Sequence, residues 1–269
     1  MTIAYDGRPH SGWQHVGDGR SVQEHVEVAV ARVLKSPRLV RLHASGRTDA
    51  GVHALAQIAH FDIPLDWRME TQAWMRALNC QLPPSIRVLA ADEVDPRFHA
   101  RRHATGKHYR YRLYNGVLLH PLDHGVVWHW PWPLDLVAMR AAVPEFLGVR
   151  DFSAFAAYRH DGTDSDPGSG RNIREIWRFD ITRDGDYLTM DIEGKGFLYK
   201  MVRLMVGALI HVGKGSLDSA GLRALFLCEH DATGRLVKSP LCVGAEGLYL
   251  VEVFYDAGHG FRQDGLAVP

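Results

Sequence analysis

An arginine and an aspartate lie two positions apart in residues 45–53, which read SGRTDAGVH. Gly46 and Gly51 flank the pair and permit backbone angles that other residues resist. The Asp49 side chain can hydrogen-bond to its own backbone and fix the turn. A rigid loop that presents Arg47 beside a carboxylate suits chemistry on an anionic substrate. The same local pattern is also typical of a surface turn with a chance ion pair.

A second segment, residues 97–112, combines positive charge with aromatic rings and contains no acid. We call it the basic strip, and its charged residues are Arg97, Arg101, Arg102, Lys107, Arg110 and Arg112. This combination is typical of a surface that contacts phosphates and stacks on bases. The alternative is a solvated strand face, although such faces usually mix both signs of charge. The period of a strand would place Lys107, Tyr109 and Tyr111 together on one face.

The bulk composition indicates an ordinary globular chain. Its 269 residues are 46% hydrophobic and 23% charged, which fits one large domain or two smaller ones. The formal net charge of zero argues mildly against a nucleic-acid-binding protein, since such proteins are usually basic. The sequence has no signal pattern and no apolar run of about 18 residues. Its cysteines, Cys80, Cys228 and Cys242, form no CxxC pair. We therefore expect a cytoplasmic protein with reduced cysteines and no contact with a membrane.

Apolar periodicity predicts a similar order of elements in both halves of the chain. In the first half we expect strands at 2–5, 40–43, 54–63 and 86–94, and helices after Ser21 and at about 68–80. In the second half we expect strands at 107–115, 125–130, 173–182, 187–193 and 248–255, and helices at 133–147, 197–212 and 218–228. Ser21 and Glu24 have the spacing of a capping box, which marks the start of the first helix.

This order predicts an α+β fold of two ferredoxin-like βαββαβ halves, related as a pseudo-duplication with a central cleft. We place the N-terminal half at 1–103 and the C-terminal half at 104–256. Residues 257–269 are expected to form a flexible tail. A cleft between two such halves is a natural place for a site.

Two basic residues interrupt the apolar segment 197–212. A helix that is apolar nearly all round should be buried, yet Lys200 and Arg203 lie three positions apart, on one face of the predicted helix. A buried arginine needs an anionic partner, and Asp49 is the candidate that the sequence offers. The alternative is that the arginine extends along the helix to the surface.

Motifs for metals and cofactors fail on inspection. His99 and His103 have HxxxH spacing, but Ala100 stands where a zinc peptidase has glutamate. Residues 213–216 lack the upstream glycine and the preceding strand of a phosphate-binding loop. Residues 194–196 lack the third glycine of a dinucleotide fingerprint. We expect no metal and no cofactor.

Ordered blocks along the chain resemble the tRNA pseudouridine synthase A family. In order, the blocks are YDG at 5–7, SGWQ at 11–14, SVQE at 21–24, GRTDAGVH at 46–53, FHAR at 98–101, YRY at 109–111, DFSAF at 151–155, GFLYKMVR at 196–203 and EGLYL at 246–250. They follow the order of the family from end to end of the chain. GRTDAGVH is highly specific, so the interpretation as a chance surface turn loses most of its weight.

The resemblance implies isomerisation of uridine to pseudouridine at positions 38–40 in the anticodon stem-loop of tRNA. The C1′–N1 bond is cleaved, the uracil turns, and it is rejoined through C5 without a cofactor or metal. On this resemblance Asp49 is the catalytic aspartate, and Arg203 is the arginine that pairs with it. Tyr109 is a further catalytic residue on this resemblance, which stacks on the target base and helps to remove the C5 proton. Arg47 holds the flipped nucleotide. The resemblance also implies a homodimer in which one tRNA contacts both subunits.

Basic residues of the strip and of segment 197–212 or next to it are the candidates for binding the substrate, and three other functions are alternatives to the one implied by the resemblance. Candidates for contact with RNA are Arg97, Arg101, Arg102, Lys107 and Lys200. An acidic loop at 159–170 departs from the family pattern and would restrict which tRNAs fit. Rivals are a non-catalytic tRNA-binding or chaperone protein, a glycosidic hydrolase, which usually needs two carboxylates, and a synthase with another RNA target. Whether Asp49 attacks C1′ or C6, or removes the C2′ proton, is open at this point.

Overall fold

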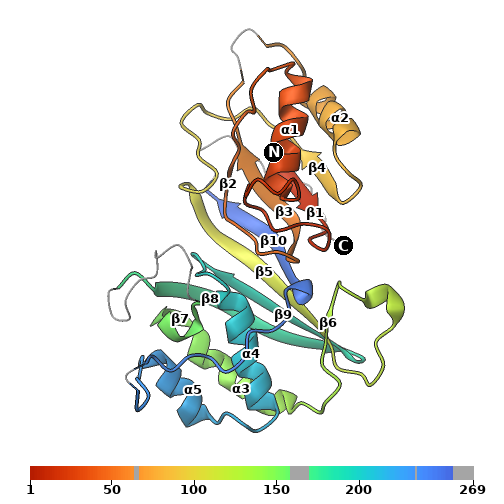
Figure 1. Cartoon of the computed structure of the whole chain (residues 1–269). Coiled ribbons are helices and arrows are strands. Elements are labelled where there is room, and N and C mark those ends of the chain that lie inside the picture. The colour runs from red at the N-terminus through yellow and green to blue at the C-terminus, as the bar shows by residue number, and fades with distance from the viewer. Residues whose placement is uncertain (64–66, 158–169, 234, 257–269) are drawn as a thin grey trace. The chain divides into compact units, whose positions relative to one another are not determined.

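The chain folds into two compact units. The computed structural model describes residues 1–63, 67–157, 170–233 and 235–256 (Figure 1). The first unit comprises Met1–Lys107 with Tyr249–Pro269, and the second comprises His108–Leu248. Both units contain helices and strands, so the predicted α+β class is confirmed. The expected acidic loop, apart from Gly170, and the expected tail at 257–269 lie outside the described residues.

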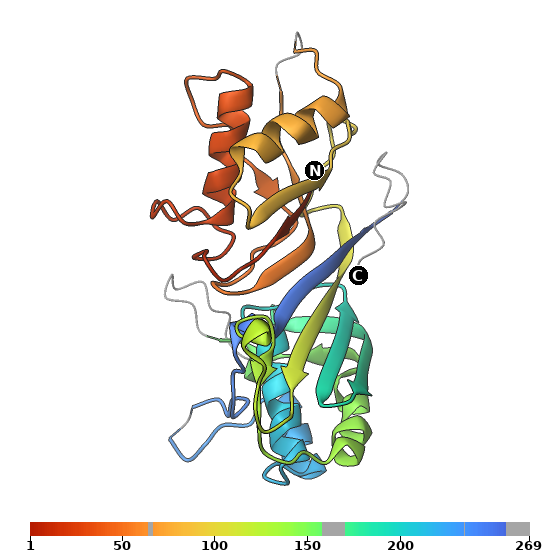
Figure 2. The same cartoon turned by 90° about the vertical axis from the view of Figure 1, so that its right-hand side faces the viewer.

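The first unit is a sheet with two helices. In chain order its elements are β1 (Thr2–Tyr5), α1 (Val22–Val33), β2 (His43–Ala44), β3 (His53–His60), α2 (Thr71–Gln81), β4 (Ile86–Ala90) and β10 (Leu248–Tyr255). The sheet order is β4-β1-β3, and both β2 and β10 pair with β3. The helices α1 and α2 lie on one face of this sheet (Figures 1 and 2). The sequence analysis placed β10 in the C-terminal half, whereas it runs parallel to β3 and Tyr249–Tyr255 belongs to the first unit.

Helix α1 begins where the sequence predicts, but its cap differs from the expected one. The Ser21 hydroxyl accepts a hydrogen bond from the Glu24 N–H at 3.3 Å. The Glu24 carboxylate accepts the N–H of Gly19 at 3.0 Å, and not that of Ser21. The helix therefore starts with half a capping box and a tie to the preceding loop. Val26 and Val30 are fully buried on its inner face.

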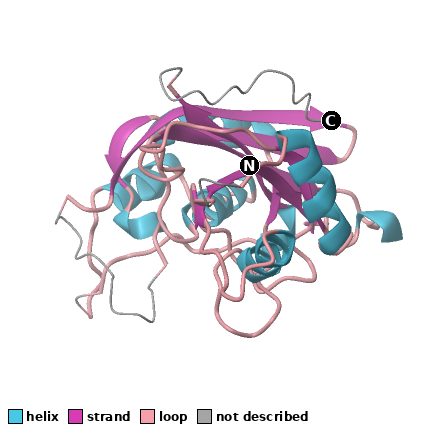
Figure 3. Cartoon of the chain, turned by 90° about the horizontal axis from the view of Figure 1, so that it is seen from above, coloured by secondary structure: helices cyan, strands magenta, loops and turns pink. Residues whose placement is uncertain are grey.

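The second unit combines strands and helices. Its elements are β5 (Ala104–Tyr114, which starts in the first unit), β6 (Trp128–His129), α3 (Leu136–Ala142), β7 (Gly148–Asp151), β8 (Ile173–Asp184), β9 (Tyr187–Gly194), α4 (Met201–Gly213) and α5 (Ser219–Phe226). The sheet order is β5-β9-β8-β7, with β6 beside β5. The predicted hairpin of β8 and β9 is confirmed, and Asp184 faces Tyr187 across its turn. Long connections, pink in Figure 3, join these elements.

Two predicted helices of the second unit have different bounds. Pro144 cannot continue a helix, so α3 ends at Ala142 and Val143–Phe146 forms a 3₁₀ turn. The helix expected from residue 197 begins at Met201 instead, because Lys200 has a φ of 59° and lies outside the helix. The predicted burial of α4 is confirmed along nearly its whole length. Among the described residues, no helix has both the length and the apolar character that a bilayer span requires.

Candidate active site

The Arg–Asp loop, residues 45–52, connects β2 to β3, and Gln57 of β3 holds its start. The Ser45 N–H donates to the carbonyl of Ile58 at 2.8 Å, and its hydroxyl donates to Gln57 Oε1 at 2.6 Å. The Gln57 amide in turn donates to the carbonyl of Gly46 at 3.1 Å. Gln57 is fully buried. Its amide therefore fixes the loop from inside the first unit.

Two glycines of the segment before α1 contact the Arg–Asp loop where no side chain fits. A Cβ on Gly7 would lie 2.2 Å from the carbonyl oxygen of Val52. A Cβ on Gly12 would lie 2.7 Å from the carbonyl oxygen of Thr48, and Gly12 also has a φ of +99°. The N–H of Trp13 donates to that same Thr48 oxygen at 3.0 Å. Backbone thus packs on backbone, which leaves the loop little freedom to move.

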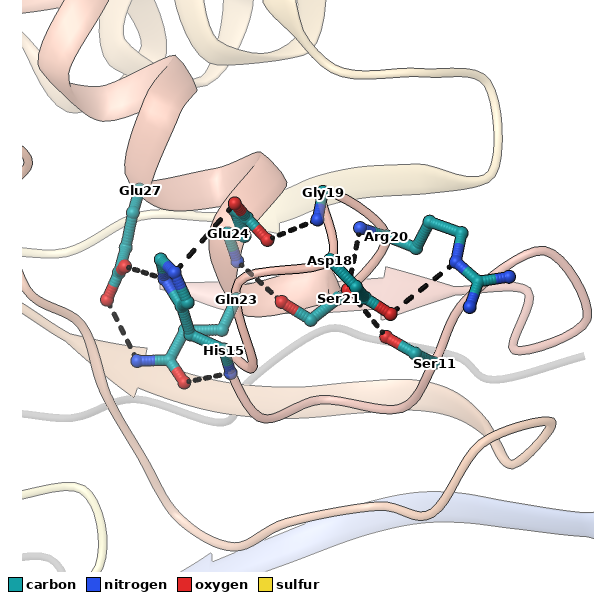
Figure 4. A network of polar contacts seen from close by, with 9 residues as sticks. All are labelled: Ser11, His15, Asp18, Gly19, Arg20, Ser21, Gln23, Glu24 and Glu27. Atoms are coloured by element: carbon teal, nitrogen blue, oxygen red, sulfur yellow. Dashed lines mark hydrogen bonds and ion pairs between the residues drawn. The ribbon is translucent and has the colours of Figure 1, made fainter.

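The segment that carries Gly12 is itself tied to α1 by the polar network in Figure 4. The His15 N–H donates to Gln23 Oε1 at 3.0 Å, and its ring nitrogen Nδ1 lies 3.1 Å from Glu27 Oε2. The Gln23 amide donates to Glu27 Oε1 at 2.8 Å, and both residues are buried. Asp18 accepts a hydrogen bond from the Ser11 hydroxyl at 3.2 Å. This network anchors the backbone against which the Arg–Asp loop rests.

Tyr5 and His53 hold the loop from the sheet. The hydroxyl groups of Tyr5 and Thr48 lie 2.8 Å apart, and burial raises the pKa of Tyr5 to about 12, so the phenol stays protonated at neutral pH. His53 accepts the Gly7 N–H at Nδ1 at 3.1 Å, and its ring stacks on Tyr249 with centroids 4.6 Å apart. In the sequence these positioning residues are visible only as family blocks, because their partners lie up to two hundred residues away.

Arg47 and Asp49 occupy this fixed loop with different exposure. Arg47 is exposed, and Asp49 is half-buried. A nearby second carboxylate, Asp6, is engaged by Arg8, whose guanidinium donates to both of its oxygens at 2.7 to 3.0 Å. Burial by itself raises the pKa of Asp6, but the hydrogen bonds and the charge of Arg8 bring it below its usual value. Asp6 therefore stays ionised and is unsuited to act as a general acid.

Lys107, at the first-unit end of β5, lies over the Arg–Asp loop. Its Nζ is 2.9 Å from the place that a Cβ on Gly46 would take. The side chain is half-buried, and desolvation together with the charge of Arg101 lowers its pKa to about 8. Arg101 and Arg102 are exposed. Arg97 is exposed too, and its guanidinium lies 2.9 Å from Asp95.

In the second-unit part of the basic strip, most side chains are buried or bound to other residues of the unit, so they are less available to a ligand than the sequence indicates. Tyr109 is buried with its ring edge-on to Phe197 at 5.0 Å, and Tyr111 is fully buried with its hydroxyl on the Gly244 carbonyl at 2.9 Å. His108 Nε2 and Arg110 Nε meet one oxygen of Asp191, at 2.6 and 2.9 Å. Tyr111 is therefore a core residue of the second unit and does not present its ring to a ligand.

Arg203 and Lys200 lie at the start of α4 in different settings. Arg203 is half-buried and donates from Nε to the carbonyl of Val243 at 2.7 Å. The prediction that Lys200 shares a helix face with Arg203 is wrong, because the left-handed conformation of Lys200 precedes the helix. Asp49 and Arg203 belong to different units, and their pairing stays a prediction.

The histidines near the basic strip bond to backbone. His103 Nδ1 accepts the His99 N–H at 3.2 Å, and His60 Nδ1 lies 3.2 Å from the Ala100 N–H. In residues 1–63, 67–157, 170–233 and 235–256, no three histidine, cysteine or acidic side chains are arranged to hold a metal ion.

Comparison with known proteins adds an independent line of evidence. Residues 1–101 and 142–256 match the family described as tRNA pseudouridine synthase. A tRNA pseudouridine synthase A from Akkermansia muciniphila is 42% identical over 257 residues, covering 95% of this chain and 94% of the relative. Relatives of the same name from Geobacter sulfurreducens and Bacillus pumilus are 44% and 39% identical, covering 85% and 95% of this chain and 89% and 98% of their own lengths.

These matches class the protein as an isomerase. The chain belongs to the tRNA pseudouridine synthase family, and the resemblance noted in its sequence is confirmed. The most specific block of that resemblance is the Arg–Asp loop, which Gln57, Gly7, Gly12 and the Trp13 N–H hold in place.

Proposed function

We propose that the protein converts uridine to pseudouridine at positions 38–40 in the anticodon stem-loop of tRNA. The observation that carries the proposal is the clamped Arg–Asp loop, in which backbone contacts fix a half-buried Asp49 while Arg47 stays exposed. Breaking the C1′–N1 bond and forming a C1′–C5 bond on the same base is redox-neutral. One well-placed carboxylate is therefore a sufficient starting point, and the engaged state of Asp6 argues against a mechanism with two carboxylates.

Asp49 is the catalytic group in this proposal. A uridine in a stem is stacked, so the enzyme has to extrude it before the carboxylate can reach the sugar or the base. Asp49 then attacks C1′ or C6, or removes the C2′ proton; all three routes need its anionic form. Pairing with Arg203 favours that form.

Tyr109 and Arg47 act on the flipped nucleotide. A tyrosine ring under a base contributes about 1–3 kcal/mol of stacking, and Phe197 keeps the Tyr109 ring in one orientation. Arg47 is exposed and binds the nucleotide through its guanidinium. Both contacts hold the extruded base close to the carboxylate, which lowers the entropic part of the barrier.

The remaining contacts go to the RNA backbone. We assign them to Arg97, Arg101, Arg102, Lys107 and Lys200. Arg97 pairs with Asp95 on the surface, and an exposed pair of this kind contributes at most about 1 kcal/mol, so a phosphate can replace the acid. Such contacts position the RNA and do not read its sequence.

We also infer a pseudo-duplicated pair of ferredoxin-like βαββαβ halves, with the N-terminal half at 1–103 and the C-terminal half at 104–256, whose last strand, β10, pairs with β3 of the first unit. The orders β1-β3-β2 and β5-β9-β8 support the duplication, because in both the first of the three strands in the chain pairs with the third and the third pairs with the second. A homodimer that binds one tRNA across both subunits, in the cytoplasm, completes the proposal.

Chemical mapping of pseudouridine in tRNA transcripts tests this function. The native protein should modify only uridines placed at positions 38, 39 or 40, and a transcript with cytidines there should stay unmodified. Pseudouridine elsewhere would indicate a different RNA target. Free uracil in the supernatant would indicate a hydrolase, and unmodified but bound tRNA would indicate a non-catalytic binding protein.

A further inference from the structure

Lys107 is the least compensated charge near the Arg–Asp loop. Its ammonium is half-buried, and in the described part of the chain no carboxylate or hydrogen-bond acceptor pairs with it. The charged group that acts on it is another cation, Arg101 of the connection between β4 and β5. An ammonium withdrawn from water without an anion is unfavourable, so this arrangement is complementary to an anionic ligand.

Gly46 makes room for Lys107. A Cβ at position 46 would lie 2.9 Å from Nζ and 3.3 Å from Cε, closer than such atoms normally approach. The peptide of Gly46 cannot move aside easily, because Gln57 binds its carbonyl at 3.1 Å. The glycine is not in a left-handed conformation. Its small size, and not its backbone freedom, is therefore what leaves room for the Lys107 ammonium, which a Cβ at this position would displace.

We propose that Lys107 and Arg101 form a phosphate subsite over Gly46, which holds one phosphodiester of the RNA beside the Arg–Asp loop. Gly46 directly precedes Arg47 and lies three positions before Asp49. A phosphate bound there belongs to the nucleotide that the loop acts on, or to its direct neighbour. The subsite deepens the proposed function and rests on it for the identity of the RNA.

Lys107 has a function distinct from that of the exposed arginines, including its partner in the subsite, Arg101. Arg101 and Arg102 lie on the surface and are screened by salt. The Lys107 ammonium is partly desolvated, so its attraction to a phosphate is stronger and its position is more restricted. Lys107 is thus a positioning residue that fixes the backbone of the reacting nucleotide.

A charge-deletion cycle between protein and RNA tests the subsite. Binding of an anticodon stem-loop is measured with the Asp49→Asn protein, so that turnover does not interfere. Each stem-loop carries one neutral methylphosphonate, placed in turn at the phosphates that flank position 39. We expect Lys107→Gln to weaken binding of the unmodified RNA about ten- to a hundredfold, the range for a hydrogen bond between charged groups. One methylphosphonate should weaken binding to the same extent and have no further effect on Lys107→Gln.

Two further variants separate charge from shape. Lys107→Arg keeps the charge but is too wide for the space over Gly46, so it should bind as weakly as Lys107→Gln. Gly46→Ala should displace the ammonium and reduce the effect of the same methylphosphonate. Lys214→Gln removes an exposed lysine of the second unit and should bind like the parent. Melting temperatures within 2 °C of the parent, an order-of-magnitude tolerance, establish that the variants are folded.

The pH dependence gives a separate readout. Arg101 and Lys107 are the charged groups of the subsite, and the loop residue beneath them, Gly46, does not titrate. Since the Lys107 amine has a pKa of about 8 in the free protein, phosphate binding requires proton uptake above that pH. Affinity should fall about tenfold from pH 7 to pH 9 in the parent and stay level in Lys107→Gln.

Additive effects of Lys107→Gln and every methylphosphonate would overturn the subsite. This result is distinguishable from failure of the proposed function. If coupling is found while mapping detects no pseudouridine, the subsite stands on a protein that binds RNA without isomerising it. If mapping succeeds and no phosphate couples to Lys107, the function stands and the subsite is wrong.

Discussion

The Arg–Asp loop and the basic strip are built in opposite ways. In the loop, neighbouring backbone determines the geometry, through Gly7, Gly12 and the N–H of Trp13, and the side chain of Arg47 remains exposed. In the strip, side chains determine the geometry, and one acid of another strand, Asp191 of β9, takes up part of its charge. A rigid presentation of charge therefore depends on what packs behind the backbone, and not on the number of charges that follow one another in the sequence.

The strip loses its uniform charge because a strand alternates its faces. Asp191 of β9 binds both His108 and Arg110, so these two residues are engaged within the second unit. The residues on the alternate face divide further, since Tyr111 enters the core while Lys107 stays beside the Arg–Asp loop. Phosphate contact and base stacking, the two functions expected of the strip, therefore depend on individual residues and not on the strip as a whole.

Disturbing the backbone behind the loop should have the largest effect on activity. Gly12→Ala introduces a Cβ 2.7 Å from the Thr48 carbonyl, so the loop has to shift. We expect kcat to fall about a hundredfold, the usual cost of misplacing a catalytic group by an ångström. The measurement is initial rate on tRNA. Gly17→Ala is the matched control: its φ of +79° imposes similar strain with nothing within 4 Å, and it should keep kcat within about twofold. Equal losses in both variants would refute the role of the close contact.

Disturbing the strip should affect stability more than chemistry. Asp191→Asn leaves Arg110 and His108 without their anion, and we expect the free energy of unfolding to fall by about 2–3 kcal/mol. Urea unfolding measures this. The control Asp180→Asn breaks a half-exposed pair with Arg178 and should cost under about 1 kcal/mol. A loss at Asp191 no larger than at Asp180 would contradict the structural importance of this pair.

The smallest effect concerns the histidines beside the strip. Burial, followed by the charges of His99 and His43, lowers the pKa of His60 to about 4. The unfolded chain, with a histidine pKa near 6.5, therefore binds more protons between these values. The contribution of neutral His60 to the free energy of unfolding is therefore fully present above about pH 6.5, and it is lost progressively as the pH falls towards 4. His60→Gln should flatten this decline in urea unfolding, while exposed His230→Gln should not. If the free energy of unfolding falls just as steeply with decreasing pH in His60→Gln, groups other than His60 determine the loss of stability in acid.

Local signals predicted elements of both units and the Arg–Asp loop. The cap at Ser21, the hairpin of β8 and β9 and the burial of α4 each follow from residues that are close together in the sequence. The Arg–Asp loop lies between two strands as expected, because glycines and a turn-forming aspartate mark it locally.

Long-range packing accounts for what the sequence analysis missed. Nothing near Arg110 in sequence points to Asp191, which is 81 positions away. The close contacts at Gly7, Gly12 and Gly46 arise from atoms that approach from other elements. The conformation of Lys200 depends on how α4 begins, a choice that apolar periodicity does not register.

Release of tritium from tRNA that carries [5-³H]uridine tests the central claim most directly, because forming the C1′–C5 bond expels the proton of C5. The native protein should release tritium, and Asp49→Asn should be slower by about a thousandfold while binding tRNA with similar affinity. Asp184→Asn, an exposed aspartate of β8, serves as the control and should match the native rate. Release by Asp49→Asn at the native rate would contradict the assignment of Asp49 as the catalytic group.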